Sequence, residues 1–191
     1  MDGFAVAKTI RTAEQSDTER LVRQAKADPA NFTSLYRRYV TGVYRYIYAR
    51  VRNHDEAEDL TAQVFLDALK GLDRFDGSRN FTAWLFTIAR NKVVDSRRKG
   101  RALLPLDAIL EAPADDDDPH HANDDAEMFD RLRALLRELP PDKQELIQLR
   151  FAGGLSFAEI GKVVGKSEAA VKMAVRRVLH QLQEKMEAHH G

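Results

Sequence analysis

Apolar residues recur every three or four positions along most of the chain, which is the period of an amphipathic helix. No segment sustains the alternation of apolar and polar residues that a half-buried strand shows. The pattern predicts a largely helical chain, with the following helices: 18–27, 31–52, 55–72, 82–101, 127–139, 141–151 and two more between 155 and 182. We therefore predict an all-α fold.

Three of these helices carry clear apolar stripes. In 31–52 the stripe consists of Phe32, Leu35, Tyr36, Tyr39, Val43, Tyr46 and Ile47. In 55–72 it consists of Leu60, Val64, Ala68 and Leu69. In the next helix, for which Thr82 is a candidate N-cap, it includes Trp84, Leu85, Ile88 and Val94. Such stripes predict helices that pack against one another rather than isolated ones.

The most specific local pattern lies near the C-terminal end, where two short helical segments flank Gly165-Lys166-Ser167. Ser156 and Glu159 have the spacing of a capping box, Gly165 suits a left-handed helix end, and Ser167 suits the next N-cap. The buried face of the second helix is predicted to be Val171, Val175, Val178 and Leu182. Its opposite face carries Ala169, Lys172, Met173 and Arg176. This arrangement is typical of a helix-turn-helix motif, whose second helix enters the DNA major groove.

The same stretch is also compatible with an ordinary helical hairpin that has a solvated basic face. Gly161 favours the first interpretation, because a residue without a side chain lets two short helices approach closely. The rest of the chain has to decide between the two.

Charge is strongly segregated although the formal net charge is zero. Residues 31–101 carry net +6 and residues 131–191 net +4, whereas residues 102–130 hold ten acidic side chains and no lysine or arginine. The stretch "APADDDDPHHANDD" has the composition of a disordered tether. We therefore predict two small helical domains, 18–101 and 127–188, joined by a flexible acidic linker at 102–126 and preceded by a flexible N-terminus at 1–17. Two basic blocks suggest two polyanion-binding modules.

The residue inventory argues against several other classes of protein. The chain has no cysteine, so it has no disulfide framework and no thiolate metal site. Carboxylates at the start of the 55–72 helix are better read as dipole partners than as metal ligands, and no catalytic constellation is visible. No apolar run is long enough to cross a membrane, and the N-terminus lacks the layout of a signal peptide. We expect a cytoplasmic protein, nucleoid-associated when active, with no catalytic residues, no metal and no cofactor.

Aromatic and basic residues are interleaved between positions 74 and 98. Phe75, Phe81, Trp84 and Phe86 lie among Arg74, Arg79, Arg90, Lys92, Arg97 and Arg98. This mixture suits the capture of single-stranded nucleic acid, because bases stack on rings and phosphates pair with cations. The competing interpretation places the rings in the core, and it is the stronger one for Trp84, which lies one turn from Ile88.

Four stretches together resemble the extracytoplasmic-function group of bacterial sigma-70 factors, over residues 20–188. "LYRRYVTGVYRYIYARV" (35–51) and "EAEDLTAQVFLDAL" (56–69) are similar to the start of the family's region 2. "FTAWLFTIARNKVVDSRRK" (81–99) is similar to the part that melts and reads the −10 element. "LPPDKQELIQLRFAGGLSFAEIGKVVGKSEAAVK" (139–172) is similar to region 4, whose helix-turn-helix reads the −35 element.

The resemblance implies a sigma factor that binds RNA polymerase core, through the β′ clamp helices and the β flap, and directs initiation at promoter DNA; an anti-sigma factor is a further implied partner. It assigns polymerase binding to Glu56, Asp59, Leu60, Gln63, Val64 and Asp67. It assigns −10 contacts to Arg74, Ser78, Arg79, Asn80, Phe81, Trp84, Arg90, Asn91, Arg97 and Arg98. It assigns −35 contacts to Ser167, Glu168, Ala169, Lys172, Met173, Arg176 and Arg177.

The sequence departs from the family's pattern at Ala62, Gln63, Lys166 and Ala174, so the resemblance does not name the −35 bases. The alternative function is a helical DNA-binding regulator that acts without joining polymerase. A response regulator is disfavoured, because its receiver domain would need alternating strands and helices.

Overall fold

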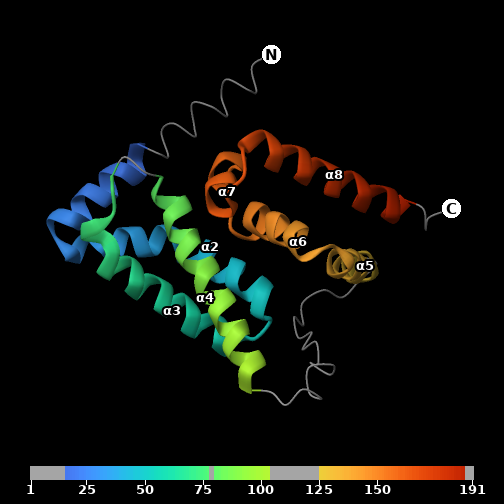
Figure 1. Ribbon diagram of the computed structural model, residues 1–191, viewed down its shortest axis with the longest axis horizontal. Coiled ribbons are helices and arrows are strands. Elements are labelled where there is room, and N and C mark those ends of the chain that lie inside the picture. The colour runs from blue at the N-terminus through green and yellow to red at the C-terminus, as the bar shows by residue number, and fades with distance from the viewer. Residues whose placement is uncertain (1–15, 78–79, 104–124, 188–191) are drawn as a thin grey trace. The chain divides into compact units, whose positions relative to one another are not determined.

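The structure is a computed structural model that describes residues 16–77, 80–103 and 125–187 (Figure 1). Within these ranges the secondary structure is helical and contains no strand, which confirms the predicted all-α class. The chain forms two compact units, Met1–Ala112 and Pro113–Gly191. None of the described helices combines the length and the apolar character that a bilayer-spanning segment needs.

Unit 1 begins with a helix at residues 16–27 and a short 3-10 turn, Pro29–Asn31, followed by three long helices. These are α2 (Phe32–Val51), α3 (His54–Gly71) and α4 (Phe81–Leu103), with a second 3-10 turn, Leu72–Arg74, before α4. Arg52 adopts a left-handed conformation at the end of α2, and Asn53 caps α3 by accepting a hydrogen bond from the Glu56 N–H at 2.8 Å. The chain therefore reverses direction between α2 and α3 with both helix ends satisfied.

The core of unit 1 lies where α2, α3 and α4 pack on one another. Its fully buried side chains are Leu35, Val43, Tyr46, Ile47, Val64, Leu85, Phe86 and Val93. Each large apolar side chain removed from water contributes about 1.5–3 kcal/mol. Most residues of the predicted stripes are buried, so the stripes are mostly correct. Tyr36, Leu69 and Val94 lie at their margins and are 39–45% exposed.

Unit 2 contains α5 (Asp125–Glu138), α6 (Pro141–Ile147), α7 (Phe157–Val164) and α8 (Glu168–Glu187). Pro141 opens α6, as predicted, because proline at a first helical position loses no hydrogen bond. The predicted helix 141–151 is interrupted, since Gln148–Ala152 forms a π-helical turn in which the Gly153 N–H donates to the Gln148 carbonyl at 2.9 Å. The helices pack around Leu146, Leu149, Leu155, Ile160, Val171 and Val175.

Candidate nucleic-acid interface

The turn between α7 and α8 has the local geometry that the sequence predicts. Ser156 and Glu159 form a complete capping box at the start of α7, and Gly165 ends that helix with φ +69°. The Ser167 hydroxyl accepts a hydrogen bond from the Ala170 N–H at 3.2 Å, so it caps α8. A Cβ atom on Gly161 would lie 2.5 Å from the Lys166 carbonyl oxygen, which shows how closely the turn approaches α7. These contacts fix the direction in which α8 leaves α7.

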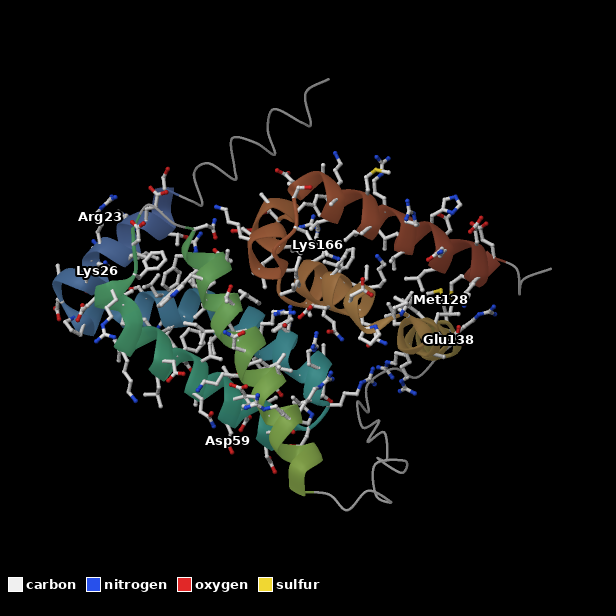
Figure 2. All side chains as sticks on the ribbon, in the orientation of Figure 1. Arg23, Lys26, Asp59, Met128, Glu138 and Lys166 are labelled. Atoms are coloured by element: carbon white, nitrogen blue, oxygen red, sulfur yellow. The ribbon has the colours of Figure 1, made fainter. Side chains whose placement is uncertain are left out.

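The two faces of α8 differ sharply. Val171, Val175, Val178 and Leu182 are buried on one side. All seven residues predicted to contact −35 DNA are exposed: Ser167, Glu168, Ala169, Lys172, Met173, Arg176 and Arg177. Lys166, which departs from the family's pattern, is also exposed and extends from the turn (Figure 2). The side chains that a recognition helix needs are thus free to reach a major groove.

Rings fill the space beside the start of α4 in unit 1. Phe75 and Phe81 are 5% and 4% exposed, and their ring centroids lie 5.6 Å apart at 90°. The half-buried Trp84 ring lies 4.8 Å from Phe75 and 5.5 Å from Phe81. The ring of Phe81 is therefore part of the core of the free chain, and its −10 contact stays a prediction. The Trp84 ring packs against both phenylalanine rings, as its spacing favoured, and its −10 contact stays a prediction.

Asn80, rather than Thr82, caps α4. The Asn80 side-chain oxygen accepts a hydrogen bond from the Ala83 N–H at 2.8 Å, and its backbone carbonyl accepts from the Trp84 N–H at 3.1 Å. The Thr82 hydroxyl instead shares a hydrogen bond with the Tyr39 hydroxyl at 3.0 Å. The predicted cap was therefore wrong by two positions. Asn80 remains half-exposed at the helix start, and its −10 contact stays a prediction.

The remaining −10 candidates lie before or along α4. Arg74, Asn91, Arg97 and Arg98 are exposed and Arg90 is half-buried. Arg97 donates to the Arg50 carbonyl at 2.6 Å, so it also secures the last turn of α2. Ser78 and Arg79 lie outside the described residues.

Some of the predicted polymerase contacts lie on the exposed face of α3, and others lie on its buried face. Asp59 and Gln63 are exposed, and Asp59 projects away from the unit (Figure 2). Glu56 accepts a hydrogen bond from the Ser96 hydroxyl, and the Asp67 carboxylate pairs with Lys92 at 2.7 Å.

Leu60 and Val64, in contrast, are 7% and 0% exposed and belong to the core, as their place in the apolar stripe predicted. Their assignment to polymerase binding stays a prediction. Leu66 is 54% exposed on the face that includes Gln63, and sequence reasoning missed it. Its position three residues after Gln63 was the available signal.

Among the residues of unit 1 that the structure describes, Asp17 and Tyr44 have shifted pKa values. A hydrogen bond from Arg20, at 2.6 Å, lowers the pKa of Asp17, and Arg38, at 2.7 Å, adds to the effect. Partial burial raises the pKa of Tyr44, and the nearby Glu58 carboxylate and Tyr48 reinforce the shift. Neither group lies among the predicted DNA contacts. The shifts therefore describe how unit 1 is held together rather than how it binds.

A helix-turn-helix with an exposed basic recognition face, on a separate all-helical unit, defines a class of DNA-binding transcription proteins. Comparison with known proteins makes the class specific. Residues 35–102 match the family model of Sigma-70 region 2, and residues 129–182 match that of Sigma-70, region 4. The chain belongs to the sigma-70 family of RNA polymerase sigma factors, in its extracytoplasmic-function (ECF) group. This family consists of transcription initiation factors rather than enzymes.

Individual relatives agree with this assignment. The chain is 40% identical over 179 residues to the ECF RNA polymerase sigma factor BldN of Streptomyces coelicolor, covering 90% of this chain and 68% of that protein. It is 31% identical over 186 residues to the ECF RNA polymerase sigma factor SigE of Mycolicibacterium smegmatis, covering 92% and 71%. Among solved structures, the sigma factor RpoE of Bartonella quintana, crystallised with the anti-sigma factor NepR, aligns with a TM-score of 0.65 and 26% identity, covering 83% of this chain and 98% of that chain.

Proposed function

We propose that α8 reads the −35 duplex, that the Asn80 end of α4 captures a base of the −10 element, and that the exposed face of α3 binds the β′ clamp helices. The observation that carries the proposal is the segregation on α8, where all predicted −35 contacts are exposed opposite a buried valine stripe. An α-helix with one free basic face fits the major groove and leaves its other face to hold the domain together.

The −10 role of Asn80 rests on its position. Strand separation costs unpairing and unstacking, so a group that captures an extruded base offsets part of this cost. Asn80 is half-exposed at the start of α4, and an amide side chain has the donor and acceptor groups that match a base edge. Arg74, Asn91 and Arg98 are exposed in the same unit and can contact phosphates.

Because Asn80 also caps a helix, a change to alanine confounds two roles, and a matched pair separates them. We expect Asn80→Ala and Asn80→Ser both to impair −10 opening by roughly 1–3 kcal/mol, the range for a base contact. Serine caps a helix about as well as asparagine, so Asn80→Ser removes the amide and keeps the cap. Permanganate reactivity of −10 thymines in complexes with RNA polymerase core measures opening, and a pre-melted bubble template should restore transcription. Normal opening by Asn80→Ser, with a defect only in Asn80→Ala, would return Asn80 to a purely structural role.

The polymerase-binding role of α3 predicts an effect at Leu66. An exposed leucine beside Asp59 and Gln63 suits the centre of a contact, since apolar side chains contribute most when a partner covers them. We expect Leu66→Ala to weaken binding to core by about 1–2 kcal/mol without changing the stability of the free chain. Fluorescence titration of labelled protein with core measures this. Val94→Ala removes another exposed apolar residue, 45% exposed against 54% for Leu66, from α4 and should bind core normally; equal losses in both variants would contradict a contact centred on α3.

An anti-sigma factor is a further proposed partner, supported by the likeness to the Bartonella protein crystallised with one. We also propose that unit 2 contacts the β flap and that the protein acts in the cytoplasm on the nucleoid, where polymerase and promoters lie. The acidic linker 102–126 would then connect the two DNA-reading units without binding DNA itself, because ten acidic side chains at 102–130 repel a polyanion.

A further inference from the structure

The helix at residues 16–27 lies before the segment that matches region 2, which begins at residue 35. It is nevertheless part of unit 1, with Thr18, Val22 and Ala25 buried. Its hydrogen bonds reach two places that flank Asn80 in the sequence. One is the 3-10 turn Leu72–Arg74 with the following Phe75, which it bonds directly, and the other is the first turn of α4, which it reaches through Tyr39 of α2.

The first connection is made by Lys26 (labelled in Figure 2). Its ammonium group donates to the Phe75 carbonyl at 2.6 Å and to the Asp73 carbonyl at 3.3 Å. A 3-10 turn ends in carbonyl groups without partners within the turn, and a cation beside them satisfies the groups and the local dipole together. Lys26 thereby ties the C-terminal end of the helix at 16–27 to the chain just before residues 76–80.

The second connection is a chain of three hydroxyl groups. The Thr18 hydroxyl lies 2.9 Å from that of Tyr39, which lies 3.0 Å from that of Thr82. Thr18 is 6% exposed, so loss of its partner would leave a buried polar group unsatisfied. Beside it, Asp17 pairs with Arg38 of α2 at 2.7 Å. The part of the same helix around Thr18 is thereby tied to the chain just after Asn80.

These two connections, with the contact between the Phe75 and Phe81 rings, hold the residues before and after Asn80 at a fixed separation. We propose that Lys26 and Thr18 are positioning residues that fix Asn80 and the first turn of α4 in the geometry needed for base capture. The proposal rests on the −10 role proposed above for Asn80. It gives residues 16–27 a part in promoter opening that does not require them to touch DNA.

The first test uses amide hydrogen exchange in the free full-length chain. We expect Lys26→Met and Thr18→Val to speed exchange about tenfold at Phe75, which donates to the Leu72 carbonyl, and at Ala83, which donates to Asn80. Lys26→Arg and Thr18→Ser keep a donor or hydroxyl and should restore protection. Arg23→Met changes an exposed cation on the same helix and is the matched control. The Ala57 amide, bonded to the Asn53 carbonyl at the far end of α3, should not change in any variant.

The second test measures opening with RNA polymerase core. Lys26→Met and Thr18→Val should open the −10 element several-fold more slowly than wild type, with normal transcription from a bubble template, and the conservative variants should recover. Unchanged exchange at Phe75 and Ala83, or an equal increase at Ala57, overturns the proposal, because the helix then only stabilises the unit.

The two proposals fail in different ways. If Asn80→Ser is defective in opening while Lys26→Met has altered exchange and normal opening, the positioning role is wrong and base capture stands. If the Asn80→Ser variant opens the −10 element normally, base capture by Asn80 is wrong. The role of Lys26 and Thr18 in promoter opening is then wrong as well. The exchange data still decide whether the two connections constrain Asn80.

Discussion

A variant that carries both Lys172→Ala and Arg176→Ala is expected to lose most −35 recognition. The two side chains lie one turn apart on the exposed face of α8, opposite the buried Val171 and Val175. Each substitution should cost roughly 1–3 kcal/mol if the side chain reads a base edge, and less if it contacts only phosphate. Run-off transcription of genomic fragments with core enzyme first identifies promoters. The binding of the whole chain to duplexes of these promoters is then measured for each variant.

Salt dependence separates the two kinds of contact, because a lost phosphate contact lowers the slope of affinity against salt concentration by about one. Lys185→Ala serves as the control for the loss of one cation in each single variant, since it removes a cation from the far end of α8 where Lys185 pairs with Glu138 at 2.7 Å. If the double variant binds its duplex as well as Lys185→Ala does, α8 is not the recognition helix.

Replacing Gly161 with alanine is expected to be the most damaging single-methyl change in unit 2. The new Cβ would lie 2.5 Å from the Lys166 carbonyl oxygen and 3.5 Å from the Glu168 nitrogen, both backbone atoms that no side-chain rotation can move. Relief requires α7 and the turn to separate, which also strains the hydrogen bond from the Lys166 N–H to the Gly161 carbonyl at 2.9 Å. We expect a loss of about 3 kcal/mol in the free energy of unfolding of this unit.

A urea titration followed by the amide NMR signals of α7 and α8 would measure this loss. Gly165→Ala is the comparison variant. A Cβ at position 165 would meet open space, but the backbone has a positive φ of +69°. The variant should therefore lose only the free energy of holding alanine in a left-handed conformation, about 1 kcal/mol. Equal stability of the two variants would mean that the approach of the turn to α7 is less tight than its geometry indicates.

The helix-turn-helix could be read from the sequence almost in full, because each of its determinants is local. The capping box, the glycine at the end of α7 and the spacing of the valines on α8 all lie within four residues of their partners. Gly161 could be predicted for the same reason, since its partner is the adjacent turn.

The residues that could not be predicted depend on distant packing. On α3 the apolar stripe correctly predicted that Leu60 and Val64 face inward, whereas the resemblance assigned both to polymerase binding and did not include the exposed Leu66. In the sequence, the neighbours of Phe81 are suited to nucleic acid. In the fold, the Tyr39 ring packs 5.6 Å from the Phe81 ring, and the Tyr39 hydroxyl shares a hydrogen bond with Thr82, 43 residues later in the chain. Lys26 contacts carbonyls 47 and 49 residues away, which no local pattern encodes.

The π-helical turn at Gln148–Ala152 bears on how this chain should be compared with its relatives. A π turn accommodates one residue more than an α turn, so it corresponds to a single inserted residue absorbed inside a helix. A homologue that lacks this residue would continue α6 as a regular helix and keep the later side chains, including the position of the exposed Phe151, on the same face. An alignment without a gap would instead shift these residues by one position, which is about 100° around a helix. Alignments of this region should therefore place a one-residue gap within the helix rather than at Gly153-Gly154, or residues on opposite faces will be counted as equivalent.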